Sequence, residues 1–151
     1  MKKTMWTVIV FVLSVIFSSF ICLANNNDEL LDAVIGNDIQ KANALIIKGA
    51  DVNIKDPDGW TPLVFAIYNR NFELAKLLIE KGADVNVQDF RAGNTVLMSA
   101  ADYGSVELVK FLIEKGADVN AKQKTGNTAL SNAISRQRSD IVKILKEAGA
   151  K

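Results

Sequence analysis

The hexapeptide Lys48-Gly49-Ala50-Asp51-Val52-Asn53 is the most informative stretch of this sequence, because the chain contains it three times. It recurs as Lys81-Gly82-Ala83-Asp84-Val85-Asn86 and as Lys115-Gly116-Ala117-Asp118-Val119-Asn120, and a truncated copy stands at Ala148-Gly149-Ala150. The glycines of successive copies are 33, 34 and 33 residues apart. A fixed period of this length is typical of repeat proteins, in which each repeat is one supersecondary unit.

Two further markers keep the same period. One is a glycine followed two positions later by threonine, and the other is a single alanine. They stand at Gly59-Trp60-Thr61, Gly93-Asn94-Thr95 and Gly126-Asn127-Thr128, and at Ala33, Ala66, Ala100 and Ala133. Three markers in phase indicate four repeats, with bounds at about 27–55, 56–88, 89–122 and 123–151.

Each repeat is predicted to form two short helices. Thr61-Pro62 begins the first helix of the second repeat, because threonine caps free backbone N–H groups and proline fits the first helical turn. The second helix is predicted over residues 72–81, with Leu74, Leu77 and Leu78 on one face, and Gly82 ends it. The polar residues 83–89 then predict an extended, turn-forming connection. The predicted fold class is all-α, with stacked repeats burying one another's apolar faces.

The aspartates of the repeated hexapeptide are interpreted as turn residues. Asp51, Asp84 and Asp118 occur once per repeat, and stacked helical layers would separate them by about 10 Å. Paired catalytic carboxylates lie closer, roughly 5–9 Å apart in a cleft.

At the array ends, Asn27 and Asp28 are predicted to begin the first helix, and the last repeat carries a polar outer set. That set is Arg136, Gln137, Arg138, Ser139, Lys143 and Lys146.

These motifs resemble the ankyrin repeat. The family's threonine-proline-leucine signature stands at residues 61–63, and its glycine-alanine-aspartate-x-asparagine signature at 49–53, 82–86 and 116–120. The resemblance covers Asn27 to Lys151 and implies a solenoid of about four helix-turn-helix units with short β-hairpin connections. The third repeat has one extra residue between Asp89 and Gly93. The signature histidine is replaced by Val64, Met98 and Ser131, which predicts reduced stability. The signature proline is replaced by Val96 and Ala129.

The composition argues against catalysis and metal binding. Histidine, the commonest general base and transition-metal ligand, is absent, and the one cysteine, Cys22, lies in the N-terminal apolar run. The sequence contains neither a phosphate-binding loop nor a nucleophile elbow. We therefore predict no enzyme activity, cofactor, metal or small-molecule substrate. The net charge of +1 gives no reason to expect a nucleic-acid partner.

The N-terminal residues have the pattern of a secretory signal. Lys2 and Lys3 precede an apolar run from Met5 to Ile21, and Cys22-Leu23-Ala24 supplies small residues before a cleavage site. We predict that residues 1–24 are a signal peptide and that the protein is periplasmic or secreted. The 17-residue run is at the lower limit for a membrane span, so an uncleaved inner-membrane anchor is the alternative. Membrane contact is expected only in that case, and the repeats lie outside the cytoplasm either way.

The ankyrin resemblance implies a binding face built from the hairpin tips and the exposed parts of the first helices. Partner contacts are predicted from Trp60, Tyr68, Asn69, Phe90, Arg91, Asn94, Asp102, Tyr103, Lys124, Asn127 and Arg136. The same comparison adds Ile35, Pro57, Asp58, Ala92, Thr125 and Ser135 as positions of this face.

The aromatic content of this face favours binding. Trp60, Tyr68, Phe90 and Tyr103 are four of the seven aromatic residues after residue 24, and Trp, Tyr and Arg dominate binding energy at protein interfaces. The alternative is that Trp60 and Phe90 fold back onto the next hairpin as local packing. Arg91 belongs to the one-residue insertion, which is either an anchor for a partner or a tolerated longer loop.

Charge is unevenly distributed along the repeats. Residues 25–60 contain seven acids and three bases, whereas residues 121–151 contain seven bases and two acids. This split indicates either a partner with complementary ends or a polar cap with lysines at helix ends.

We predict a non-enzymatic protein-binding module that acts as an inhibitor, protector or scaffold, in an immunity-type or enzyme-accessory role. The alternative is a secreted effector that binds a host protein.

Overall fold

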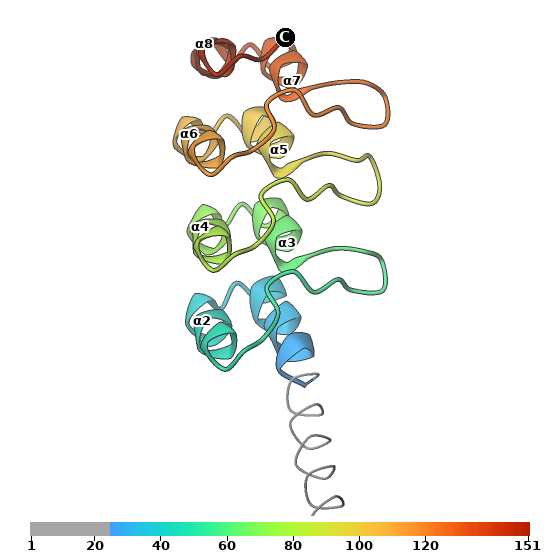
Figure 1. Cartoon of the computed structure of the whole chain (residues 1–151), viewed down its shortest axis with the longest axis vertical. Helices are drawn as coiled ribbons and strands as arrows, with labels where there is room; N and C mark the ends of the chain where they lie inside the picture. The colour runs from blue at the N-terminus through green and yellow to red at the C-terminus, as the bar shows by residue number, and fades with distance from the viewer. Residues whose placement is uncertain (1–24) are drawn as a thin grey trace, which may run out of the picture.

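The computed structural model describes residues 25–151 as a stack of helix pairs (Figure 1). The predicted signal peptide, residues 1–24, lies outside the described residues. Residues 25–35 are helical, and α2 (Ile39–Ile47) follows them. The other helices are α3 (Pro62–Tyr68), α4 (Phe72–Glu80), α5 (Val96–Tyr103), α6 (Val106–Glu114), α7 (Ala129–Ser135) and α8 (Ser139–Glu147). The all-α solenoid confirms the predicted fold class.

The helices form two columns, with one helix of each repeat in each column (Figure 1). The first helices α3, α5 and α7 make one column, and the second helices α2, α4, α6 and α8 make the other. The hairpin loops project together beyond the column of first helices. None of the helices in residues 25–151 is long and apolar enough to cross a membrane.

Side-chain caps explain where the first helices begin. The Oγ1 atom of Thr61 accepts a hydrogen bond from the backbone N–H of Val64 at 3.4 Å, and Pro62 occupies the first helical position, as predicted. Thr95 and Thr128 cap α5 and α7 in the same way. These bonds satisfy N–H groups that have no partner inside a helix.

Two residues that replace the signature histidine complete these caps. The Sδ atom of Met98 accepts a hydrogen bond from Thr95 N–H at 3.4 Å, and the Oγ atom of Ser131 accepts one from Thr128 N–H at 2.8 Å. Each side chain therefore reaches back to the residue that begins its own helix. At these two positions the replacing side chain supplies its own acceptor for the cap, and the reduced stability expected from the missing histidine stays a prediction.

The sequence prediction is correct for the end of α4 and wrong for the start of the first helix. Gly82 ends α4 with a φ of +98°, and a β-carbon added there would meet no atom within 4 Å. The left-handed backbone, not packing, therefore selects glycine at this position. The predicted start of the first helix at Asn27 and Asp28 is wrong, because residues 25 and 26 are already helical.

The connections between repeats have the predicted hairpin shape but hardly any strand pairing. Asp56 N–H donates to Trp60 O at 2.9 Å. The equivalent bonds run from Asp89 to Asn94 at 2.9 Å and from Gln123 to Asn127 at 3.0 Å. Across residues 25–151 the β pairing consists of one isolated bridge between Gln88 and Thr95. The loop arms are too short to build a ladder of such bonds.

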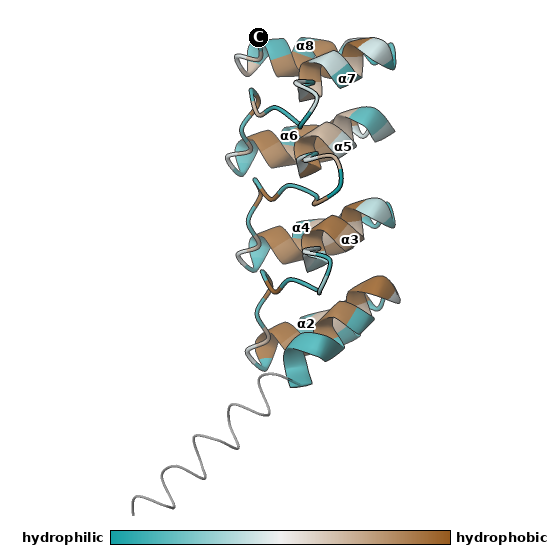
Figure 2. Cartoon of the chain, turned by 90° about the vertical axis from the view of Figure 1, so that its right-hand side faces the viewer, coloured by the Kyte–Doolittle hydropathy of each residue, from teal (hydrophilic) through white to brown (hydrophobic). Residues whose placement is uncertain are grey.

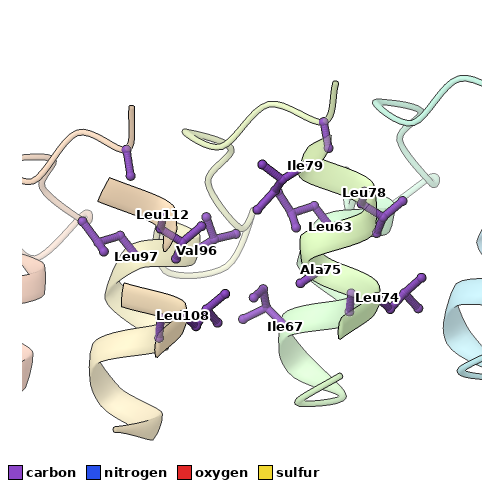
Figure 3. Packing of buried hydrophobic residues seen from close by; sticks show 14 of the residues in the cluster. Leu63, Ile67, Leu74, Ala75, Leu78, Ile79, Val96, Leu97, Leu108 and Leu112 are labelled. Carbon is purple, nitrogen blue, oxygen red and sulfur yellow. The ribbon is translucent and has the colours of Figure 1, made fainter. Parts of the chain in front are cut away.

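One hydrophobic cluster runs through the whole stack. The helices carry most of the hydrophobic residues, while the hairpin loops are mostly hydrophilic (Figure 2). Figure 3 shows Ile67 pointing toward the neighbouring repeat, whose Leu108 and Leu112 belong to the same cluster. Leu77, predicted on the same face as Leu74 and Leu78, packs at the margin of the cluster and is only partly buried.

A ladder of asparagine side chains joins the turns of successive repeats. Asn53 Oδ1 accepts a hydrogen bond from Asp84 N–H at 2.8 Å, and Asn53 Nδ2 donates one to Gly82 O at 3.1 Å. The same acceptor role recurs in the pairs Asn27 with Asp51, Asn86 with Asp118, and Asn120 with Lys151. Asn27 therefore ties the first helix to the turn that ends the same repeat, instead of beginning a helix.

The aspartates of the repeated hexapeptide are turn residues, as predicted. Asp51, Asp84 and Asp118 each accept a hydrogen bond, at 2.9 Å, from the backbone N–H two residues further along the chain. This is the bonding pattern of an Asx turn, in which the carboxylate replaces a backbone acceptor.

Candidate binding face

The predicted partner-binding residues lie on the hairpins and on the C-terminal halves or ends of α3, α5 and α7, which occupy one side of the stack (Figure 1). We refer to them together as the hairpin face. Tyr68, Asn69, Phe90, Arg91, Lys124, Asn127 and Arg136 are exposed, Asn94, Asp102 and Tyr103 are partly buried, and Trp60 is buried.

Trp60 is the one residue of this set that does not face solvent. Trp60 is only 9% exposed. The centroid of its ring lies 5.2 Å from that of Phe65 and 4.8 Å from that of Tyr68. The expectation that Trp60 faces outward is therefore wrong. The hairpin turns the indole back onto α3, where burying its large apolar ring is favourable. Trp60 supports Tyr68 from beneath.

Phe90 has the opposite environment at the tip of the next hairpin. It is 69% exposed, and it lies beside the backbone of Gly59, where an added β-carbon would be 3.8 Å from the phenyl ring. The ammonium of Lys124 lies 5.3 Å from the centre of the Phe90 ring. The same ammonium donates to Phe90 O at 2.7 Å and to Arg91 O at 3.1 Å. A lysine of the following repeat therefore fixes the backbone beneath an exposed aromatic ring.

A buried carboxylate organises the hairpin that contains the extra residue. Asp89 is 6% exposed, and its two oxygens accept hydrogen bonds from Ala92 N–H at 2.7 Å and from Gly93 and Asn94 N–H at 3.2 Å. Burying a charged group is costly unless it is hydrogen-bonded, and these three donors satisfy it. The insertion is thus a well-bonded loop, and the Arg91 guanidinium extends back to 5.4 Å from the Trp60 ring.

The end of α5 meets the preceding repeat through a cation and an aromatic ring. The Cζ atom of Arg70 lies 4.5 Å from the centre of the Tyr103 ring, a distance at which cation and π face attract. Burial raises the pKa of the Tyr103 hydroxyl, and nearby Tyr68 adds to this shift. Asn69 reaches the first repeat, where its Nδ2 donates to Ile35 O at 3.3 Å.

The last two repeats are joined on this face by an ion pair. Arg136 Nε lies 2.8 Å from Asp102 Oδ1, and Arg136 Nη2 donates to Asp102 Oδ2 at 3.1 Å. This two-pronged geometry fixes both side chains. Hydrogen bonding to Asp102 raises the pKa of the exposed Arg136 guanidinium. Both residues are therefore already paired before any partner arrives.

A family model described as ankyrin repeats (3 copies) matches residues 30–123 and again residues 93–151. The chain belongs to the ankyrin-repeat family. No curated protein matches the chain in sequence. Ankyrin repeats are generally protein–protein interaction modules, and the family is typically non-enzymatic. Within residues 25–151, acidic side chains nowhere form a group of three that could hold a metal ion.

One exposed residue beside this ankyrin face, Arg70, and one at the end of the stack, Ile134, were not predicted from the sequence. Arg70 has a φ of +55°, and the aligned positions Asn37, Gly104 and Gln137 also have positive φ, so each repeat has an exposed turn there. Aligning the repeats could have revealed it. Ile134 is 55% exposed, although the aligned Ile67 is buried, because α7 belongs to the last repeat and no later described helix packs over it.

Proposed function

We propose that this chain is an exported ankyrin-repeat module that holds one protein partner on its hairpin face, as an inhibitor, protector or scaffold. Phe90 carries the proposal: it is 69% exposed on a loop that Lys124 holds in place. The hydrogen bonds from Lys124 hold the loop in a position that leaves this large apolar ring exposed to water, where it contributes little to folding. We therefore expect the ring to contact another molecule. An immunity-type role and an enzyme-accessory role both use such a contact.

Other exposed apolar groups are available to a partner along the stack. Tyr68 is 48% exposed, Ile35 is 50% exposed and Ile134 is 55% exposed. Aromatic residues and arginines dominate the binding energy of protein interfaces. Because hydrogen bonds already order the loop of Phe90, binding costs less conformational entropy than it would for a flexible loop.

The shape of the face favours a protein over a small molecule. The hollow beside Tyr68, lined also by Val64, Asn94 and Ser99, has a volume of about 10 Å³, room for about one water molecule. Small-molecule sites are concave, bury most of the ligand and measure roughly 300–1,000 Å³. The hollow beside Phe90 reaches about 450 Å³, but it is an open groove shared by three hairpins and not an enclosed cavity. An extended surface with projecting side chains is better suited to bury area against another protein.

The binding proposal is tested by capturing the partner from the extracytoplasmic fraction of the source cell and measuring its dissociation constant. We expect Phe90→Ala to weaken binding by about thirtyfold, the effect of losing roughly 2 kcal/mol at a hot spot. Ile47→Ala is the matched control, because Ile47 is 72% exposed but lies on α2 in the other helix column. Equal affinities for wild type and Phe90→Ala would show that the partner binds elsewhere.

The export proposal is tested by cell fractionation and N-terminal sequencing. We expect a mature chain that begins at Asn25 in the periplasm. A full-length chain in the inner membrane would support the anchored alternative, and a full-length chain in the cytosol would contradict export. Recovery from the culture fluid, together with capture of a host protein, would favour the secreted effector.

A further inference from the structure

A groove beside the hairpins combines an exposed aromatic ring with lysine side chains. Its volume is about 450 Å³, and residues from three successive hairpins line it. The residues that matter for its chemistry are Lys55, Gln88, Phe90, Lys122 and Lys124. The groove therefore lies next to the hairpin face but adds two lysines, Lys55 and Lys122, that the face does not contain.

The lysines of the groove are arranged by the repeat. Lys55, Gln88 and Lys122 hold the same position in successive repeats, immediately before the residue that closes each hairpin. Gln88 Nε2 donates to Lys122 O at 3.3 Å and so ties two neighbouring hairpins together. Lys55 and Lys122 are exposed and belong to none of the ion pairs within residues 25–151.

Two acids of the same hairpins, Asp56 and Asp89, are used to build the turns, and the third, Asp58, does not line the groove. The Asp89 carboxylate is buried and accepts three backbone hydrogen bonds. Asp56 accepts hydrogen bonds from Asp58 N–H at 2.9 Å and from Trp60 N–H at 2.7 Å. These carboxylates build the turns, whereas the ammonium groups line the groove. The groove consequently presents positive charge around the Phe90 ring.

We propose that this groove binds an extended, acidic segment of the protein partner. Carboxylates at the two ends of the segment contact Lys55 and Lys122, and an apolar side chain between them packs on Phe90. The inference rests on the proposed function and names the chemistry of the partner segment.

The repeat spacing sets the pattern of that segment. Successive helical layers are about 10 Å apart, so Lys55 and Lys122, two repeats apart, are separated by roughly 20 Å. A polyproline II segment rises about 3.1 Å per residue with three residues per turn. One turn therefore spans about 9 Å and places positions one, four and seven on the same side. The matching pattern is acidic, apolar and acidic at these three positions.

Charge density favours an acidic protein segment over nucleic acid. One strand of a nucleic acid carries a phosphate for about every 3.4 Å of helix axis, whereas the unpaired lysines of the groove recur once in two repeats. Most phosphates would therefore lack a counterion. Residues 25–151 also contain 16 bases and 17 acids, so the repeat region as a whole does not attract a polyanion.

The test uses a fluorescent seven-residue peptide with glutamate at positions one and seven, leucine at position four, and proline or serine elsewhere. Its binding to the purified full chain is measured by fluorescence anisotropy. We expect the peptide to bind about tenfold more tightly than a peptide with both glutamates replaced by glutamine, the combined effect of two exposed ion pairs. Added salt should reduce this preference, because it screens exposed charges.

A double variant, Lys55→Glu with Lys122→Glu, should abolish the preference for the acidic peptide. The matched control is Lys110→Glu, an exposed lysine on α6 in the other helix column, and it should retain the preference. An equal loss in the control would overturn the proposal, since net charge alone would then explain binding. Tighter binding of short single-stranded DNA, lost in the double variant, would overturn it as well.

The two proposals fail in different ways. If Phe90→Ala weakens the natural partner but the acidic peptide does not bind, the groove proposal is wrong and the proposed function stands. If the peptide binds but the dissociation constant of the natural partner is unchanged by every substitution on the hairpin face, the proposed function is wrong. Circular dichroism of each variant confirms that these exposed substitutions leave the fold intact.

Discussion

At the scale of single residues, exposure separates two aromatic side chains of neighbouring hairpins. Trp60 packs on Phe65 and Tyr68 and is 9% exposed, whereas Phe90 is 69% exposed. We expect Trp60→Ala to lower the free energy of unfolding by about 3 kcal/mol, as loss of a buried aromatic side chain does. Phe90→Ala should change it by less than about 1 kcal/mol. Urea unfolding followed by circular dichroism measures both, and similar losses in the two variants would contradict this division.

A second residue-scale prediction concerns Gly82. Its φ of +98° is a backbone conformation that side chains with a β-carbon rarely adopt, and the space around it is open. Gly82→Val should therefore cost more than about 1 kcal/mol of stability through backbone strain alone. Gly82→Asn is the matched variant and should cost less, because asparagine tolerates the left-handed region better. An unchanged urea midpoint for Gly82→Val would show that strain at this helix end is negligible.

At the scale of helices and turns, the asparagine ladder couples neighbouring repeats. Asn86 Oδ1 accepts a hydrogen bond from Asp118 N–H at 2.8 Å, and its Nδ2 donates to Gly116 O at 3.3 Å. Asn86→Ala removes both bonds, and we expect a loss of about 1–2 kcal/mol, since each bond contributes roughly 0.5–1.5 kcal/mol. Asn86→Asp keeps the acceptor and should lose less. Thermal unfolding of the two variants measures the difference, and equal losses would place the whole effect in the donor bond.

The same scale shows which structural features a sequence can reveal. Thr61 and Gly82 were predicted correctly because a cap and a left-handed turn depend on residues adjacent in the chain. The burial of Trp60 depends on contacts with Phe65 and Tyr68 that the hairpin geometry brings about. The role of Asn27 depends on Asp51, which is 24 residues away. Local chemistry was therefore predictable, whereas the direction of a loop side chain required the packed structure.

The candidate face follows the same rule. The repeat register placed Tyr68, Phe90 and Arg136 on one side of the stack, because aligned positions of a solenoid lie above one another. It could not show that Lys124 holds the loop of Phe90, nor that Arg136 is paired with Asp102. The first contact joins a side chain to a backbone carbonyl and the second joins two side chains, in each case between residues 34 positions apart, so their geometry depends on how neighbouring repeats stack.

At the scale of the whole molecule, the linear stack turns the order of the sequence into an arrangement in space. The acid-rich residues 25–60 lie at one end and the base-rich residues 121–151 lie at the other (Figure 1). A partner with complementary ends remains a prediction of this arrangement. Because the hydrophobic cluster is continuous, each repeat depends on its neighbours for stability, and a terminal repeat has only one neighbour.

The last prediction concerns a buried leucine in the last repeat. Leu145 on α8 is fully buried, and Leu145→Ala should cost about 2–5 kcal/mol. Within the described residues the fourth repeat packs against one neighbour, so we expect the amides of α7 and α8 to exchange hydrogen much faster, while α3 and α4 stay protected. Leu112→Ala, in the middle of the stack, should instead lower the stability of all repeats together.

Opening of the last repeat should also affect binding at a distance. Lys124 precedes α7, and its ammonium holds the carbonyl oxygens of Phe90 and Arg91. Leu145→Ala should therefore loosen the loop of Phe90 and weaken partner binding, although Leu145 is buried and cannot touch a partner. Hydrogen exchange read by mass spectrometry, together with the dissociation constant, measures the two effects on one sample. If α7 and α8 open while Phe90 binds the partner with unchanged affinity, the Lys124 contacts do not order the binding face.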